Sequence, residues 1–159
     1  DAQRCERIHD NLRRLGLKAE VKAADAGLPD SWWDGRQFDA ILLDAPCTAA
    51  GIVRRHPDVR WLRRATDVEQ LVAIQRRLLD TLWPLLKPGG RLVYCTCSVF
   101  HAEGQDQVRA FLERHTDALA IPSVGHLKPG TVVVDREFND NESGGYDGFF
   151  YARFDKALP

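Results

Sequence analysis

A compact apolar run that stops abruptly in a polar turn constrains the fold more than any other segment of the chain. Residues 38–43 read Phe-Asp-Ala-Ile-Leu-Leu, and Asp44-Ala45-Pro46-Cys47 follow directly. A short run of this kind, closed by an aspartate and a proline, is typical of a buried strand in a parallel sheet. The segment therefore predicts a strand whose carboxyl end carries Asp44 and Cys47.

Helical and extended patterns alternate along the rest of the chain. Apolar residues at helical spacing predict three amphipathic helices, at residues 3–15, 66–82 and 103–115. Thr66 and Glu69 have the spacing of a capping box at the start of the second helix, and Pro84 ends it. Further extended segments are expected at residues 19–23, 91–96, near Leu119 and at 149–154, with a turn at 87–90. Strands and helices joined by short loops predict an α/β fold with a mostly parallel sheet.

Length and composition indicate one globular domain. The chain has 159 residues, of which 44% are hydrophobic and 28% charged, and this balance disfavours disorder, collagen and coiled coil. No window approaches the roughly 18 apolar residues that a membrane span needs, so no membrane partner is expected. The net charge of −1 excludes a globally basic nucleic-acid binder but allows a locally basic surface.

The counts of cysteine and methionine add two expectations. Four cysteines, at positions 5, 47, 95 and 97, are too few and too unevenly spaced for a disulfide scaffold, so a reducing, cytoplasmic compartment is expected. Methionine is absent, even from position 1, which indicates a chain that was processed or cut from a longer one.

Chemistry-bearing residues follow three of the predicted strands. The sequences at these strand ends are Asp25-Ala26-Gly27, Asp44-Ala45-Pro46-Cys47 and Thr96-Cys97-Ser98. In open α/β sheets, ligands bind beyond the carboxyl ends of the strands. We therefore expect two acids and two thiols to line one edge of the sheet.

Each of these side chains has an alternative interpretation. Cys97 could be an exposed thiolate nucleophile or a buried, inert cysteine, and for Cys95 the inert interpretation is favoured. Cys95 and Cys97 supply only two ligands and no second pair completes a tetrahedral site, so a metal is not expected. Asp44 could form a turn through backbone hydrogen bonds, or could bind a ligand amine or a base nitrogen.

A local concentration of arginine lies between the second and third predicted strands. Residues 54–64 read Arg-Arg-His-Pro-Asp-Val-Arg-Trp-Leu-Arg-Arg. Arginine forks suit phosphates and a tryptophan can stack on a base, although the segment could also be a solvated loop with a short helix. The candidate RNA-binding residues are Arg54, Arg55, Arg60, Trp61, Arg63 and Arg64.

Several of these motifs together resemble a known family. They are Asp44-Ala45-Pro46-Cys47, the segment from Gly51 to Asp58, Tyr94-Cys95-Thr96-Cys97-Ser98 and the segment from Asp147 to Ala152. The combination, which extends over nearly the whole chain, resembles the S-adenosylmethionine-dependent RNA cytosine-5 methyltransferases, and within them the bacterial 16S ribosomal RNA methyltransferase B group. The resemblance implies a Rossmann-like fold, S-adenosylmethionine as cofactor and small-subunit ribosomal RNA as partner.

The resemblance also implies roles for individual residues. Cys97 would attack carbon 6 of cytosine, which makes carbon 5 nucleophilic through a covalent adduct. Cys47 would assist breakdown of that adduct. Asp44 would hydrogen-bond the activated base or the amino group of the methyl donor, and Asp25 would contact the adenine end of the cofactor.

Parts of the family pattern are missing from this sequence. The chain contains neither the glycine-rich cofactor loop after the first strand nor the N-terminal RNA-binding region. Given the family strand order 3-2-1-4-5-7-6, the sheet should lack its first two strands, which leaves residues 19–23 without a neighbour. We therefore expect residues 1–159 to be the C-terminal part of a catalytic domain that needs its N-terminal part for activity and binds cofactor weakly or not at all.

Two other functions remain open at this point. A truncated or decayed relative could retain the arginine segment as an RNA-binding module without catalysis. A thiol redox protein could use Cys95 and Cys97, although two residues two positions apart on a strand are poorly placed for a disulfide. Retention of Cys47, Cys97 and Asp44 favours the methyltransferase.

Overall fold

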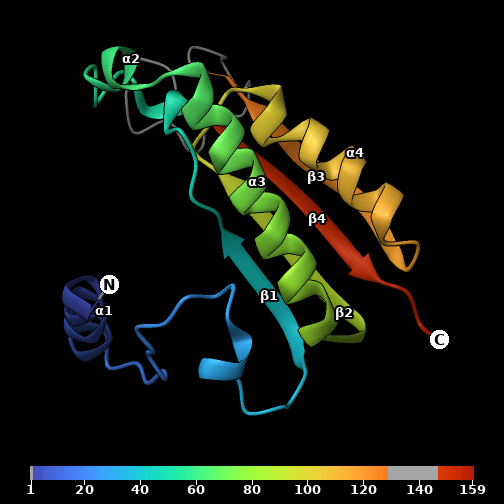
Figure 1. The fold of residues 1–159 in the computed structure, drawn as a ribbon. Coiled ribbons are helices and arrows are strands. Elements are labelled where there is room, and N and C mark those ends of the chain that lie inside the picture. The colour runs from blue at the N-terminus through green and yellow to red at the C-terminus, as the bar shows by residue number, and fades with distance from the viewer. Residues whose placement is uncertain (1, 129–146) are drawn as a thin grey trace, which may run out of the picture. The chain divides into compact units, whose positions relative to one another are not determined.

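The chain forms two compact units, residues 1–36 and 37–159 (Figure 1). The computed structural model describes residues 2–128 and 147–159. None of the helices in these two ranges is long and apolar enough to cross a membrane.

The first unit contains the helix α1, Ala2–Leu15, and a 3₁₀ turn, Pro29–Ser31. The predicted helix is confirmed, and Gly16 ends it with a φ of +66°. The prediction of a strand at residues 19–23 is wrong, because this stretch has no strand structure. An extended segment becomes a strand only when a neighbour satisfies its backbone hydrogen-bonding groups.

The second unit is built on a four-stranded sheet of β1 (Phe38–Asp44), β2 (Leu86–Thr96), β3 (Ala118–Leu127) and β4 (Phe149–Lys156). The strand order is β1-β2-β4-β3, which corresponds to positions 4-5-7-6 of the order implied by the family resemblance. The α/β class is therefore confirmed.

The directions of these strands differ from the prediction of a mostly parallel sheet. β1 and β2 pair in parallel, whereas β4 pairs antiparallel with both β2 and β3. The prediction was wrong for the described strands because hydrophobic patterning reveals that a strand exists but not which way it runs.

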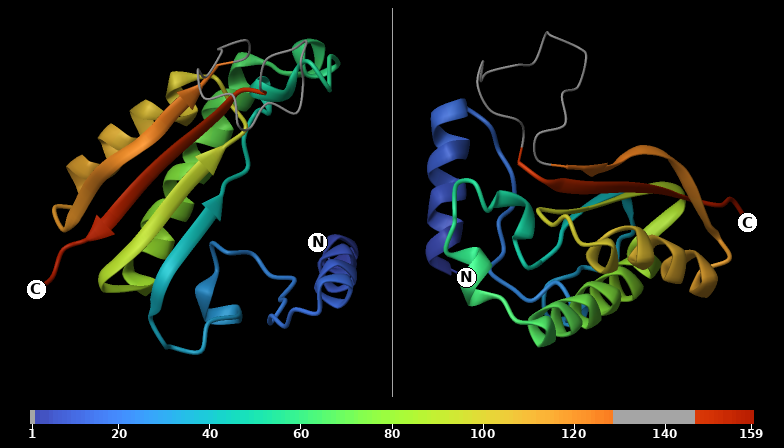
Figure 2. Two further views of the ribbon diagram at one scale, coloured as in Figure 1. Left: turned by 180° about the vertical axis from the view of Figure 1, so that it is seen from behind. Right: turned by 90° about the horizontal axis from the view of Figure 1, so that it is seen from above.

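Two main helices cover one face of the sheet, as Figures 1 and 2 show. They are α3 (Ala65–Leu82) and α4 (Gln105–Arg114), while α2 (Val59–Leu62) is a single turn in the arginine segment. Shorter 3₁₀ turns lie at Ala50–Ile52, Trp83–Leu85 and His101–Glu103.

Two local details of the prediction were wrong. At the start of α3, the Arg64 backbone N–H donates a hydrogen bond to the Asp67 carboxylate at 2.9 Å. Thr66 and Glu69 therefore do not cap this helix. Their spacing matches the motif, but Asp67 lies three residues after Arg64, the residue that precedes the helix. The predicted turn at 87–90 lies within β2, where the pairing with β1 is irregular.

Aromatic side chains dominate the core between the sheet and its helices. Phe111 of α4 is fully buried, and its ring centroid lies 5.2 Å from Trp83 and 4.8 Å from Phe154 of β4. Phe111 thus joins a helix, a 3₁₀ turn and an inner strand.

Replacing Phe111 with alanine should lower the free energy of unfolding by about 3–5 kcal/mol, because the cavity would be closed in by the sheet. Urea denaturation of the full-length protein measures this. Leu119→Ala, at an exposed position of β3, is the control and should change stability by no more than about 0.5 kcal/mol. Equal effects of the two substitutions would contradict the assigned core.

Candidate active site

Two cysteines from different loops meet at the carboxyl ends of β1 and β2. Because the strands pair in parallel with Asp44 opposite Cys95, the loops that follow them leave the same edge of the sheet. The Sγ atoms of Cys47 and Cys97 lie 3.2 Å apart, within hydrogen-bonding distance. The structure thus brings together the two thiols that the sequence placed at strand ends.

The two thiols differ in their readiness to ionise. The hydrogen bond from Cys47 lowers the pKa of Cys97 to about 7, against the opposing effect of burial. The same hydrogen bond, together with burial, raises the pKa of Cys47. One negative charge is therefore favoured on Cys97, with the Cys47 S–H as its donor.

Asp44 is exposed at the end of β1 and lies beside a third thiol. The Sγ of Cys95 is 3.8 Å from Asp44 Oδ1, and burial together with the charge of Asp44 raises the pKa of Cys95 to about 11. The Cys95 thiol is therefore less reactive than that of Cys97, as the inert interpretation required. The exposed Asp44 carboxylate suits a ligand amine.

Asp25, the other predicted cofactor residue, belongs to the first unit. Its carboxylate accepts the Gly27 N–H at 2.8 Å, and its backbone carbonyl accepts the Trp32 indole N–H at 3.0 Å. These bonds give Asp25 a role in a local turn.

A contact between two glycines joins the Cys47 loop to the start of β4. The Gly51 N–H donates to the Cys97 carbonyl at 2.9 Å, and the Gly148 N–H donates to the Gly51 carbonyl at 2.7 Å. A Cβ on Gly51 would lie 1.8 Å from the Gly148 oxygen, so no larger residue fits without a shift of backbone. The carbonyl of Cys97 is thereby held by a segment far away in the sequence.

The six candidate RNA-binding residues divide into two groups. Three have side chains that interact with other parts of the protein. Arg54 and Arg55 form ion pairs with the nearly buried Asp147, and the Arg63 Nε–H donates to the Thr48 carbonyl at 2.8 Å. The second group is Arg60, Trp61 and Arg64; all six residues are exposed, and Trp61 is 83% accessible. The Arg60 guanidinium lies 6.0 Å from the centre of the Trp61 ring.

Glu103 is a buried residue of this region that sequence reasoning missed. It is fully buried, and its carboxylate accepts hydrogen bonds from residues next to both Cys47 and Cys97. In the sequence it stands at the start of a predicted helix, where an acidic residue is ordinary. No pattern distinguished it from a solvent-exposed helix terminus.

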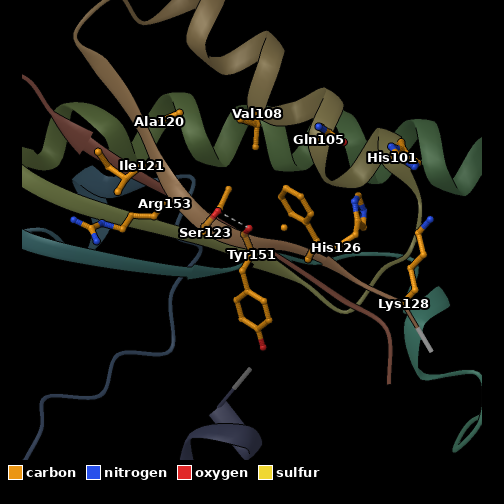
Figure 3. A pocket seen from close by; sticks show the side chains of 13 residues that line it. His101, Gln105, Val108, Ala120, Ile121, Ser123, His126, Lys128, Tyr151 and Arg153 are labelled. Atoms are coloured by element: carbon orange, nitrogen blue, oxygen red, sulfur yellow. Dashed lines mark hydrogen bonds between the residues drawn. The ribbon is translucent and has the colours of Figure 1, made fainter. Parts of the chain in front are cut away.

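A separate hollow of about 440 Å³ lies between α4 and the strands β3 and β4 (Figure 3). Val108 lies near its middle, Ile121 and Arg153 lie toward one end, and His101, His126 and Lys128 stand at the other. Neither Cys47 nor Cys97 lines it. In the ranges 2–128 and 147–159, no group of three or more His, Cys, Asp or Glu side chains could hold a metal ion.

Comparison with known proteins establishes the family. A sequence profile described as 16S rRNA methyltransferase RsmB/F matches residues 1–155. The chain belongs to the RsmB/F family. The family match confirms the resemblance indicated by the sequence motifs. S-Adenosylmethionine is the cofactor of this family.

Relatives of known sequence or structure agree with this assignment. Ribosomal RNA small subunit methyltransferase B of Salmonella newport is 50% identical over 158 residues, which are 98% of this chain and 35% of the relative. The protein of the same name from Shewanella oneidensis is 49% identical over 160 residues, 99% of this chain and 36% of the relative. The chain thus spans about a third of the length of these relatives.

Solved structures show the same fold. The crystal structure of NSun6 from Pyrococcus horikoshii with SFG, an S-adenosylmethionine analogue, has a TM-score of 0.75 and 27% identity and covers 100% of this chain and 40% of that protein. The Rossmann-like methyltransferase fold of the RsmB/F chain is therefore established.

The Cys47–Cys97 contact predicts an unusual titration of one thiol. In the full-length protein, the rate of Cys97 alkylation by iodoacetamide should rise with pH around a midpoint of about 7, because the thiolate is the nucleophile. Fragment-ion mass spectrometry of the peptide that holds both cysteines distinguishes Cys97 from Cys95. Replacing Cys47 with alanine should move the midpoint up toward the ordinary thiol value of about 8.5.

The control for this experiment is Cys95→Ala, which leaves the hydrogen bond between Cys47 and Cys97 in place. Its Cys97 midpoint should stay near that of the unaltered protein. A midpoint that does not respond to Cys47→Ala would show that the two thiols do not share a proton.

Proposed function

We propose that the full-length protein transfers a methyl group from S-adenosylmethionine to carbon 5 of a cytosine in 16S ribosomal RNA through a covalent bond between Cys97 and carbon 6. The observation that carries this proposal is the pair of thiols 3.2 Å apart, of which Cys97 has the lowered pKa. Membership of the RsmB/F family supports the reaction class and the RNA substrate.

The chemistry explains why a thiolate is needed. Carbon 5 of cytosine is too weak a nucleophile to take a methyl group unaided. Addition of the Cys97 thiolate forms an S–C6 bond and moves the C5=C6 electron pair toward carbon 5, which then attacks the methyl group. S-Adenosylmethionine, when bound, supplies that methyl group on a positively charged sulfur.

Release of the product reverses the first step. Solvent water takes the proton from carbon 5, the C5–H electron pair restores the C5=C6 double bond, and the S–C6 bond breaks to return Cys97 as a thiolate that accepts a hydrogen bond from the Cys47 S–H. Cys47 assists this breakdown, because its thiol is next to the sulfur that must leave. Its raised pKa keeps it protonated, so it does not compete as a nucleophile.

The acidic residues take the supporting roles. Asp44 is an exposed carboxylate at the strand end next to the thiols, and it hydrogen-bonds the cytosine or the amino group of the methyl donor. Asp25 contacts the adenine end of the cofactor. Residues 1–159 are the C-terminal part of the catalytic domain, and the cofactor's glycine-rich loop is supplied by the rest of the full-length protein.

Arg60, Trp61 and Arg64 of the arginine segment bind the RNA. Arg60 and Arg64 contact phosphates, and Trp61 offers a stacking surface. Arg54, Arg55 and Arg63 hold the loop that carries these residues, through Asp147 and the Thr48 carbonyl.

All described cysteines are free, in keeping with a reducing cytoplasmic compartment.

A covalent trap tests the reaction and the nucleophile together. The full-length protein is incubated with S-adenosylmethionine and 16S rRNA that contains 5-fluorocytidine, and is then analysed on a denaturing gel. Fluorine at carbon 5 blocks the final elimination, so a protein–RNA band should appear and should be lost in Cys97→Ala. With ordinary rRNA, Cys47→Ala should accumulate the adduct instead.

The control is Cys95→Ala, which should form the same band as the unaltered protein. Absence of the band, despite binding of both RNA and cofactor, would leave an RNA-binding module without catalysis. A band that persists in Cys97→Ala would assign the nucleophile to another residue.

A pair of charge-matched variants tests the RNA surface. Replacing both Arg60 and Arg64 with alanine should weaken RNA binding and reduce the slope of log K against log salt by roughly 1–2, since each lost phosphate contact contributes about 0.7–0.9. Trp61→Ala should cost about 1–3 kcal/mol through lost stacking, with little change of slope. Binding is measured by filter retention at several salt concentrations.

The matched control replaces Arg76 and Arg109, two exposed arginines of α3 and α4, with alanine. It removes the same charge and should leave the salt slope nearly unchanged. Similar slopes for the two double variants would mean that the arginine segment faces solvent in the complex.

A further inference from the structure

A fully buried carboxylate joins the two cysteine loops. Glu103 has no exposed surface, and its two oxygens accept four hydrogen bonds. Oε1 accepts the Thr48 N–H at 2.9 Å and the Gln75 side-chain amide at 3.1 Å. Oε2 accepts the hydroxyls of Thr48 at 2.5 Å and Ser98 at 2.6 Å.

The donors stand at informative places in the sequence. Thr48 directly follows Cys47, and Ser98 directly follows Cys97. Gln75 of α3 also donates to the Pro46 carbonyl at 2.9 Å, on the other side of Cys47. Glu103 therefore reaches the neighbours of both thiols, although it contacts neither sulfur.

We propose that Glu103 is a positioning residue for methyl transfer, whose carboxylate holds the Cys47 and Cys97 loops together so that the two thiols face each other. The inference rests on the proposed function, because it assigns Glu103 a role in that reaction. It does not make Glu103 a catalytic residue.

Burial explains why this arrangement is rigid. The four donors are sealed from water, so each would lose a hydrogen bond with no replacement if the loops moved away from the carboxylate. Hydrogen bonds to an ionised acceptor are short and strong. The separation between the sulfurs is thereby set by atoms one residue away from each of them.

The position and the charge of Glu103 act on Cys97 in opposite directions. The Cys47 hydrogen bond lowers the pKa of Cys97, and the Glu103 carboxylate favours that bond by holding the loops. The negative charges of Asp44 and Glu103 raise the pKa of Cys97, as does burial. A substitution that removes the charge but keeps the link is therefore distinguishable from one that removes both.

Two substitutions of Glu103 separate these effects. In Glu103→Gln, the side-chain oxygen still accepts from Thr48 and Gln75, and the amide donates to the two hydroxyls, which reverse their own hydrogens. We expect the alkylation midpoint of Cys97 to stay near 7 or fall slightly. In Glu103→Ala the loops are released, and the midpoint should rise toward about 8.5.

Methyl transfer should follow the same order. For Glu103→Ala, kcat should fall by about 100-fold, the effect of a displacement of roughly 1 Å in a reacting group, whereas KM for RNA should change little. Glu103→Gln should retain most of the rate, as expected when the link rather than the charge is required. Both are measured in the full-length protein with S-adenosylmethionine and 16S rRNA.

Two further variants guard against a misfolded Glu103→Ala. Ser98→Ala removes one arm of the link and should raise the Cys97 midpoint by a smaller amount. Trp83→Phe is the control, since it deletes a hydrogen bond from another buried side chain, here to Asp117 at 2.9 Å. Trp83 precedes β2, whereas Cys97 follows the other end of that strand. It should leave the midpoint and kcat unchanged.

The outcomes separate this inference from the proposed function. If Glu103→Ala and Ser98→Ala keep the Cys97 midpoint and kcat of the unaltered protein, Glu103 does not position the thiols. If Trp83→Phe changes both as much as Glu103→Ala does, the effect is one of general stability and the inference fails. If the unaltered protein does not methylate RNA but its thiol midpoint responds as described, the proposed function fails while the link between the loops stands.

Discussion

The parallel ladder between β1 and β2 brings together loops that lie 50 residues apart in the sequence. Parallel neighbours end at the same edge of a sheet, so the residues that follow β1 and β2 lie close together. This backbone pairing alone brings Asp44, Cys47 and Cys97 into one small region. The ladder fixes where the two loops begin, but it does not fix the positions of Cys47 and Cys97 within them. The Gly51–Gly148 contact and the buried Glu103 carboxylate remove that freedom.

The electrostatics of the site follow from this close approach. Two thiols in contact cannot both be charged at low cost, so one proton is shared unequally and the negative charge favours Cys97. Nearby carboxylates oppose that charge, and the thiol hydrogen bond has to outweigh them. A thiolate and a protonated thiol therefore arise from two identical side chains through position alone, which suits the proposed reaction, in which one sulfur bonds to the base and the other does not.

Much of the fold could be predicted from the sequence because its signals are local. The helices at 2–15, 65–82 and 105–114 follow apolar periodicity, and β1 follows a compact apolar run. The antiparallel direction of β4 depends on long-range pairing, which local patterns do not encode. For the candidate site, strand ends indicated Cys47 and Cys97, but Glu103 and the inward bond of Arg63 depend on burial and on partners that are remote in sequence.

The position of β4 between β2 and β3 has a consequence for synthesis of the chain. β4 comes last of the four strands in sequence, yet it pairs with both of those strands, and Gly148 at its start holds the Cys97 loop through Gly51. A nascent chain that has emerged only as far as β3 can form the β1–β2 ladder, but it has no partner for β3 and an incomplete support for the Cys97 loop. Because the chain is made from its N-terminus, the complete support for the thiol pair forms only after Gly148 and β4, which follows it, have left the ribosome.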